Sequence, residues 1–272
     1  MLTPRQQPAT GVEPWTRERL LLALAAGAVV VATLMAGLGL ILIQAFIPPR
    51  SGTYGGDRSD VAAPDTTSVR DRIAAEPMAS LEPAAATRPD PATDMPPALG
   101  VPLPVVGRGP AGVPVYGHTP EGAVAQLAAI DRQVLEAMSL PQARDAHAAW
   151  VLPGGPAFAQ WDLTVNVSGF LRGARQGATK DATTVVRVTP AGGLVKGADG
   201  PDWLVACVLL DVRAAIQGEY RMGWAHCQRM QWQDGRWQVA PGVPPAAAPS
   251  AWPGSKAALA AGWLAWVEDG EG

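Results

Sequence analysis

Residues 203–239 read WLVACVLLDVRAAIQGEYRMGWAHCQRMQWQDGRWQV, and this stretch decides the fold. It opens with an apolar run over 203–212, continues with a strand-like run over 219–232 and closes with a short run over 236–239. Asp234-Gly235, between the last two runs, is a strong signal for a tight hairpin turn. We therefore expect three consecutive antiparallel strands, with the first reversal at residues 216–218.

The two cysteines of the chain, Cys207 and Cys227, are equally distant from residue 217, the centre of that reversal. In a hairpin centred there they face each other on neighbouring strands. Two interpretations remain open. They form a disulfide, as cysteines do outside the cytoplasm, or they are a pair of buried thiols, because free cysteine is often buried.

The residues before this stretch predict helices followed by one more strand. Thr119-Pro120-Glu121 is a helix start, with an N-cap threonine and proline at the first helical position. A second short helix is expected from residue 141 to about 152, while residues 157–175 fit a helix and a strand equally. The β-branched run 183–188 predicts a strand that ends at the Pro-Ala-Gly-Gly of 190–193.

The order of these elements predicts the fold class of residues 115–272. Helices come first and a meander of about four antiparallel strands follows, which is typical of an α+β domain with helices packed on one face of a curved sheet. Ser255 is expected to cap a final helix with Leu259, Trp263 and Trp266 on one side. Nine of the ten tryptophans lie at or after Trp150, so the core is expected in this part.

Residues 48–114 differ in composition from the part that follows. They hold 13 prolines and one aromatic residue, Tyr54. Such a segment has too little apolar surface to offset the entropy of ordering, and it is predicted to be a disordered Pro/Ala-rich linker. A G-x-G-x-x-G pattern at 107–112 lacks the preceding strand of a dinucleotide site and contains Pro110, so it does not indicate a nucleotide.

Residues 20–47 carry no charge over 28 positions. About 20 apolar residues suffice to cross a bilayer, and the run is too long for the apolar region of a signal peptide. We expect a single-pass transmembrane helix in the cell (plasma) membrane. The tail of residues 1–19 is short and contains Arg17 and Arg19, which favours a cytoplasmic N-terminus and an extracytoplasmic domain 115–272.

Small residues recur within that predicted helix at spacings of three and four. Such a stripe allows helices to approach closely in lipid and indicates a homo-oligomer, but an alanine-rich composition also produces it by chance. The two interpretations weigh equally. The stripe consists of Ala25, Ala28, Ala32, Ala36 and Gly39.

Composition and motifs argue against several classes of function. The net charge of −3 and the pI of about 5.6 argue against direct nucleic acid binding, which needs clustered Lys and Arg. The three histidines, His118, His147 and His226, are isolated from other metal-type ligands. We expect no catalytic residue, no cofactor and no metal; His226 and Asp211 are the candidates for a base if the domain has a pocket.

Two short motifs carry a resemblance to a known family. They are YGHTPEGA at residues 116–123, which opens a helix, and WQDGRWQV at residues 232–239, which closes the meander. The pair resembles actinobacterial single-pass proteins of conjugative elements, which are similar in plan to the bitopic assembly factors of type IV secretion, including the TcpC-like transfer proteins. The scarcity of Lys beside abundant Ala, Gly and Pro is also typical of a GC-rich bacterial genome.

The resemblance implies a nuclear-transport-factor-like cone outside the membrane and a non-enzymatic, structural role in a DNA-transfer channel of a Gram-positive bacterium. The expected partners are membrane lipid and other envelope or secretion-complex proteins. The alternative is an extracytoplasmic ligand-binding or enzymatic cone tethered to the membrane, which predicts an apolar pocket with convergent polar groups.

Overall fold

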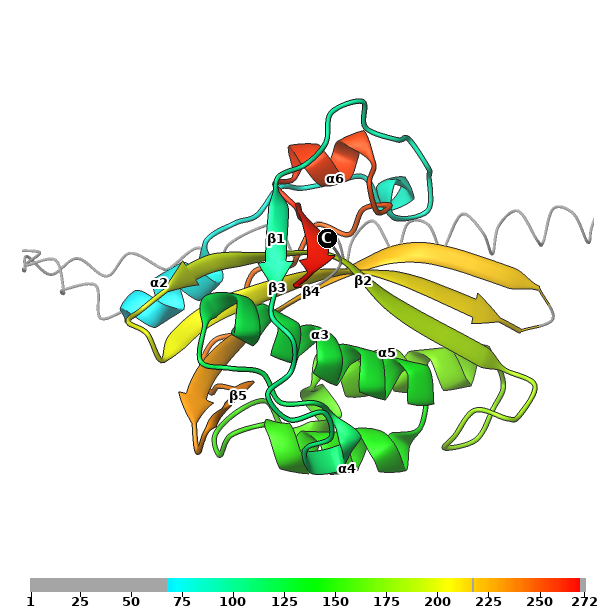
Figure 1. Ribbon diagram of the computed structural model, residues 1–272. Helices are drawn as coiled ribbons and strands as arrows, with labels where there is room; N and C mark the ends of the chain where they lie inside the picture. The colour runs from blue at the N-terminus through cyan, green and yellow to red at the C-terminus, as the bar shows by residue number, and fades with distance from the viewer. Residues whose placement is uncertain (1–67, 217, 270–272) are drawn as a thin grey trace, which may run out of the picture. The chain divides into compact units, whose positions relative to one another are not determined.

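The computed structural model describes residues 68–216 and 218–269, and they form an α+β domain (Figure 1). Its six-stranded sheet has the strand order β1-β6-β2-β3-β4-β5. The long strands are β2 (Val185–Ala198), β3 (Trp203–Ala215) and β4 (Glu219–Gln233), and the short β5 (Arg236–Val239) closes the meander. The predicted α+β class and the antiparallel meander are confirmed.

The turn between β4 and β5 has the geometry that its sequence predicts. Asp234 and Gly235 both have positive φ, 52° and 74°, as a two-residue hairpin turn of the favoured type requires. Trp232 and Trp237 are directly opposite each other across this hairpin.

The sheet curls into a half-barrel because β2 is irregular. Its pairing with β3 shifts register at Pro190/Gly192 and again at Val195/Gly197, and such bulges bend a strand. The strand therefore continues through residues 190–193, where the sequence predicted its end. A Cβ on Gly193 would lie 2.7 Å from Val124 and 2.8 Å from Leu99, so glycine permits a close approach of the helix layer.

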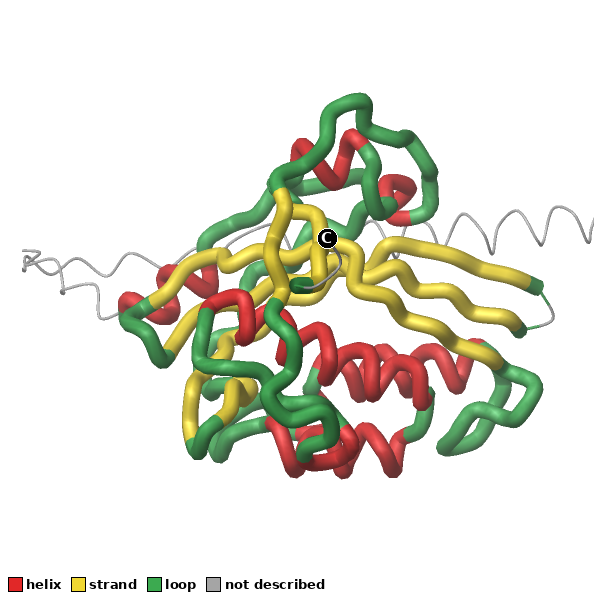
Figure 2. The backbone as a smooth tube through the Cα atoms, in the orientation of Figure 1, coloured by secondary structure: helices red, strands yellow, loops and turns green. Residues whose placement is uncertain are grey.

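Three helices cover one face of the sheet: α3 (Pro120–Ala137), α4 (Leu140–Trp150) and α5 (Asp162–Gly173) (Figure 2). The start of α3 is as predicted, because the Thr119 hydroxyl accepts the backbone N–H of Gly122 at 2.9 Å. The ambiguous residues 157–175 form a 3₁₀ turn, η3 (Phe158–Gln160), and then the helix α5. Helices packed on one face of a curved sheet are thus confirmed.

The central strand β3 is buried on both sides. Leu204, Ala206 and Val208 belong to the core under the helices, whereas Trp203, Val205 and Cys207 belong to a second core on the opposite face. A strand that is apolar at every position needs a cover on each face. The apolar run 203–212 therefore implies a second layer, which the sequence-based assignment did not contain.

Residues 68–114 supply much of that second layer, so the prediction of a disordered linker over 48–114 is wrong for this part. They form α2 (Val69–Ala75), two 3₁₀ turns, η1 (Pro83–Ala86) and η2 (Pro110–Gly112), and β1 (Ala98–Val101). The strand β1 pairs in parallel with β6 (Leu264–Glu268). These elements are too short for hydrophobic periodicity to reveal them, and they gain order from contacts with residues far along the chain.

Two ion pairs and one apolar contact fasten α2 to the sheet, and Arg229 is the buried member of these ion pairs. The side chain of Arg229 on β4 is 6 % exposed, and its Nη1 lies 2.5 Å from Oδ1 of Asp71. Arg70 pairs with Asp199 at 2.6 Å, and Ile73 packs where a Cβ on Gly197 would clash. The folded domain therefore includes residues 68–114 as well as the predicted part from residue 115 onward.

The C-terminal helix is shorter than predicted. Ser255 caps α6 (Lys256–Ala260) through the N–H of Ala258, as expected, but the helix ends before Trp263. Gly262 has φ 85°, a conformation that stops a helix, and Trp266 then lies in β6.

The expected tail 1–19, the expected membrane span 20–47, residues 48–67 and the small-residue stripe of the span lie outside the described residues. Within 68–216 and 218–269, none of the helices combines the length and the apolar character that crossing a membrane requires.

The register of β3 and β4 places Cys207 directly opposite Cys227, as the midpoint argument predicts. The structure joins their sulfur atoms in a disulfide, in the centre of the second core. The thioether of Met78 lies against it, 3.6 Å from the sulfur of Cys227. Residues 68–114 are called the N-terminal cover below. Met78 belongs to this cover and thus shields the disulfide from solvent.

Replacing both cysteines by alanine is expected to lower the free energy of unfolding by about 2–4 kcal/mol, because the bond closes a loop with a sequence separation of 20. Urea unfolding of the wild type and the double variant measures the difference. Wild type unfolded under reducing conditions is the control and should match the variant. Equal midpoints for oxidised and reduced wild type would contradict the prediction.

Candidate functional site

The strongest candidate site is a buried charged cluster around His226 on β4. The Nδ1 atom of His226 lies 2.9 Å from Oδ2 of Asp131 on α3. Its Nε2 atom lies 3.4 Å from Oδ2 of Asp162, the first residue of α5, and 3.0 Å from the side-chain nitrogen of Gln228. Asp131 is fully buried and the side chain of His226 is 6 % exposed. The cluster joins two helices to the sheet.

The cluster retains a proton that the unfolded chain would release. Burial by itself lowers the pKa of His226, but the carboxylates of Asp131 and Asp162 outweigh burial and raise this pKa to about 9. Burial raises the pKa of Asp131, against the attraction of His226. Hydrogen bonding to His226 lowers the pKa of Asp162. At neutral pH the folded cluster therefore holds one proton more than these groups hold in water.

The space around this cluster is filled by side chains. Large residues with less than 2 % exposure occupy the interior between the helices and the sheet, among them Trp150, Trp161, Trp237, Leu127, Ile130 and Met230. Five hollows of the described part lie elsewhere, and none of these five is lined by His226, Asp131 or Asp162.

The structure does not bring the two predicted base candidates together. His226 faces the helix layer, whereas Asp211 lies on the opposite face of the sheet, in line with Cys207 and Leu209 on β3. Asp211 instead accepts hydrogen bonds from Arg213 and Arg221. The partners of His226 come from α3 and α5, which no local sequence pattern connects to β4.

The other two histidines lie in separate aromatic surroundings. His147 is edge-on to Phe158 and Trp161, and its Nε2 atom lies 2.8 Å from the carbonyl of Pro156. His118 stacks on Trp232 at 4.4 Å and lies 2.8 Å from Asp202. Among the described residues, no three His, Cys, Asp or Glu side chains come together as metal ligands do.

The two motifs that carry the family resemblance meet in the structure. Trp237 donates its indole N–H to the carbonyl of Gly117 at 3.1 Å, and His118 stacks on Trp232. A Cβ on Gly122 would lie 2.2 Å from the same carbonyl, so glycine is required there. The motifs therefore form one structural lock between the start of α3 and the β4–β5 hairpin.

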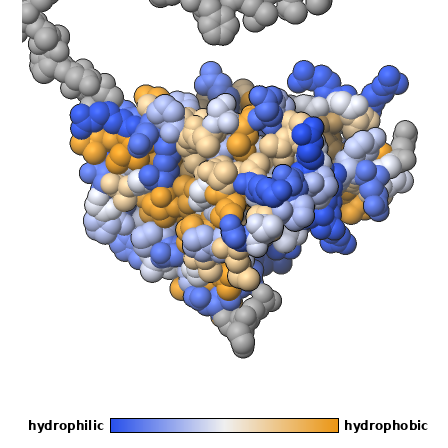
Figure 3. All heavy atoms as spheres, turned by 90° about the horizontal axis from the view of Figure 1, so that it is seen from above, coloured by the Kyte–Doolittle hydropathy of each residue, from blue (hydrophilic) through white to orange (hydrophobic). Residues whose placement is uncertain are grey.

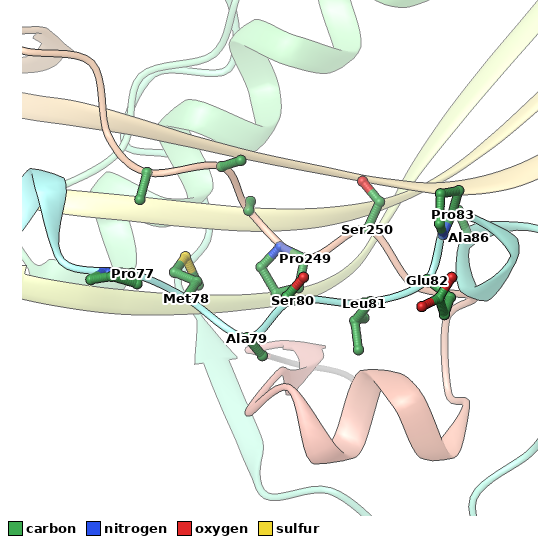
Figure 4. A pocket seen from close by; sticks show the side chains of 13 residues that line it. Pro77, Met78, Ala79, Ser80, Leu81, Glu82, Pro83, Ala86, Pro249 and Ser250 are labelled. Carbon is green, nitrogen blue, oxygen red and sulfur yellow. The ribbon is translucent and has the colours of Figure 1, made fainter. Parts of the chain in front are cut away.

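A slot lies on the face opposite α3, between residues 77–86 and 246–250 (Figure 4). Hydrogen bonds close it at both ends, from Ala246 to the carbonyl of Ala74 and from Trp252 to that of Ala85. Its volume is about 450 Å³, and proline and alanine dominate the lining. The slot lacks the convergent polar groups that orient a small ligand.

A row of arginines on this face escaped the sequence analysis. Arg187 on β2, Arg213 on β3 and Arg221 on β4 are directly opposite one another on adjacent strands. A signal for part of this row was present: Arg213 and Arg221 are equidistant from residue 217, as the two cysteines are. The same register argument therefore finds the pair, whereas the bulged register of β2 hides Arg187.

Comparison with known proteins leaves the family open. No family model, no curated protein and no solved structure matches this chain.

Proposed function

We propose that this chain is a non-enzymatic, single-pass membrane protein that serves as a structural or assembly component of a conjugative, type IV secretion-like DNA-transfer complex in a GC-rich Gram-positive bacterium. Its N-terminus is cytoplasmic, and its C-terminal domain, a nuclear-transport-factor-like cone, lies outside the membrane. The domain contacts other envelope proteins and binds no nucleic acid directly.

The filled interior of the half-barrel carries this proposal. An enzyme or a small-molecule carrier of this architecture needs a cavity that reaches its polar groups, and here aromatic side chains occupy that space. A domain with a packed interior acts through its surface. A scaffold acts in this way, because it binds its protein partners through its surface.

Two further observations support the proposed location and partners. The disulfide Cys207–Cys227 is of a kind that persists in oxidising compartments, in keeping with a domain outside the cytoplasm. The motifs 116–123 and 232–239, which carry the resemblance to transfer proteins, form one contact at the start of the helix layer.

The experiment is a DNA-transfer assay in a host whose conjugative element lacks this chain. Transfer should fall by orders of magnitude, and the full chain should restore it, whereas residues 68–272 secreted without the span should not. The full chain should also co-purify with transfer proteins after cross-linking in native membranes. Normal transfer without the chain would overturn the proposal.

The alternative, an extracytoplasmic ligand-binding or enzymatic cone, is favoured by one observation. Asp162, which lies 3.4 Å from Nε2 of His226, has a side chain that is 58 % exposed, so the cluster extends from the buried histidine to the surface. This alternative requires α5 to move away from β4. It predicts that small-molecule ligands shift the amide NMR signals around His226 in residues 68–272, and that Asp162→Asn, which leaves the Asp131 contact intact, abolishes these shifts in a fully folded protein. Unchanged signals of the wild type across a ligand library would argue against it.

A further inference from the structure

The row of Arg187, Arg213 and Arg221 lies at one end of the sheet, where the strands extend beyond the helix layer (Figure 1). Like charges directly opposite each other on neighbouring strands repel and destabilise the pairing. Asp211 offsets the repulsion between Arg213 and Arg221, whereas the repulsion between Arg187 and Arg213 is a cost to the fold that a ligand of opposite charge removes.

Two of the three guanidinium groups are held in fixed orientations. Asp211, of which the side chain is 10 % exposed, binds Nε and Nη2 of Arg221 at 2.8 Å each and Nη2 of Arg213 at 3.0 Å. Arg221 also stacks over Trp252 at 4.3 Å. The Nη1 groups of both arginines are not used in these contacts and remain as donors for an oxyanion.

The third guanidinium, that of Arg187, has no ion pair within the described part of the chain and is exposed. All three arginines line one surface hollow of about 410 Å³. Its lining includes one carboxylate, Glu219, and two exposed apolar side chains, Val185 and Tyr220, which are 45 % and 65 % exposed. Together with Asp211, the hollow has three positive groups against two negative ones.

The face that bears this row is also the face on which the first described helix packs. Helix α2 packs on Gly197 and Trp203, on the same side of the sheet as Arg213. Only residues 48–67 separate Ile47, the end of the expected span, from the first described residue, and 20 residues reach about 70 Å at most. The arginine row lies about 35 Å along β3 from Trp203, so the bilayer surface is within its reach.

The residue types fit a lipid surface. Arginine forks match the geometry of phosphate groups, which are the anionic groups at a bilayer surface. Hydrophobic and hydrophilic side chains are interspersed in the view from above (Figure 3). The domain as a whole is not basic, so the attraction comes from this row and not from net charge.

We propose that Arg187, Arg213 and Arg221 bind the phosphate groups of anionic phospholipids and hold this face of the domain against the membrane that carries its anchor. The inference rests on the proposed membrane anchorage. It adds a second, reversible contact with lipid, made by the folded domain itself.

The test uses the full chain in lipid nanodiscs, with amide hydrogen exchange measured in β3 and β4 next to their turn. In discs that contain phosphatidylglycerol, exchange there should be slower than in discs of phosphatidylcholine alone, by about fivefold for each arginine engaged. Arg187→Glu should reduce the difference by at least about fivefold, because it removes one of the engaged arginines. Arg108→Glu, which changes an exposed arginine with no ion pair in the described part, is the matched control and should retain it.

Each other outcome contradicts a distinct part of the inference. Equal exchange in both kinds of disc would overturn it while leaving the anchorage intact. Slower exchange on adding inorganic phosphate to phosphatidylcholine discs, with no effect of phosphatidylglycerol, would assign the row to a free anion and overturn the lipid contact. Failure of the chain to enter discs of either composition would overturn the anchorage, and the inference with it.

Discussion

Residues 115–272 expressed alone will not fold, whereas residues 68–272 will give a stable domain. The shorter fragment starts where composition places the domain boundary, but it lacks β1 and the whole N-terminal cover. Without that cover, the second core around Trp203 and the disulfide is exposed to water on one side.

The size of the effect follows from the apolar side chains that the shorter fragment lacks. The removed segment contributes Leu99, Val101 and Val113 to the core under the helices, each at most 7 % exposed, and Ala74 to the second core. Each fully buried valine or leucine contributes about 1.5–3 kcal/mol. Domains of this size are stable by about 5–15 kcal/mol in total, so the combined loss is comparable with the whole stability.

The truncation also leaves charged groups without partners. Arg229 loses its ion pair with Asp71. The edge of β6 loses the parallel strand that covers it, and such an edge promotes aggregation.

Circular dichroism and two-dimensional NMR spectra of the two fragments test this prediction. The longer fragment should show cooperative unfolding and dispersed amide signals, and the shorter one should show neither or should aggregate. A fragment of residues 48–272 is the control for the extra N-terminal length, and it should match residues 68–272. Cooperative unfolding of residues 115–272 would show that the N-terminal cover is dispensable.

Replacing Asp131 by asparagine is expected to lower the free energy of unfolding by about 3 kcal/mol at neutral pH, because the protonated His226 then loses its closest carboxylate in a buried site. Asparagine keeps the size of the side chain, so the change isolates charge from packing. Asp145→Asn, at an exposed position of α4, is the matched control and should be near neutral.

The same cluster predicts how stability depends on pH. The pKa of His226 is about 9 in the folded state against 6.5 in the unfolded state, so between these values the folded protein binds more protons than the unfolded chain. Stability from this group is complete below pH 6.5 and is lost as the pH rises through 9, with a total change of up to about 3 kcal/mol.

Urea unfolding at constant ionic strength between pH 6 and pH 10 measures this dependence. The free energy of unfolding of the wild type should fall across the upper part of that range, and the Asp131→Asn variant should show a flatter profile. Parallel profiles for the two proteins would mean that His226 is neutral in the folded state.

Local patterns were sufficient for the meander and its register. The Asp234-Gly235 turn fits its hairpin because only a few residue types adopt positive φ there at low cost. Cys207 and Cys227 are equally distant from residue 217, so a tight reversal there places them opposite each other. The hydroxyl of Thr119 marks the start of α3, because it accepts a backbone N–H of the first turn. In each case the interacting groups are close in sequence or related by one turn.

The lock between residues 116–123 and 232–239 was visible in the sequence only as two separate motifs. The structure shows why each holds its residues: Trp237 needs an acceptor, which the carbonyl of Gly117 supplies, and Gly122 leaves room for it. These motifs touch because the sheet places the β4–β5 hairpin next to the start of α3.

The sequence by itself determined the β3–β4–β5 meander, the Asp234-Gly235 turn and the start of α3, because hydrophobic period and turn chemistry act over a few residues. Only the tertiary structure decided that residues 68–114 are ordered, that β1 pairs in parallel with β6, and that His226 meets Asp131 and Asp162. A short proline-rich segment has too little local preference for helix or strand to fold alone. It becomes ordered when it packs against apolar surface that residues far along the chain provide. Likewise, the pKa of a histidine depends on carboxylates that the fold brings from other elements.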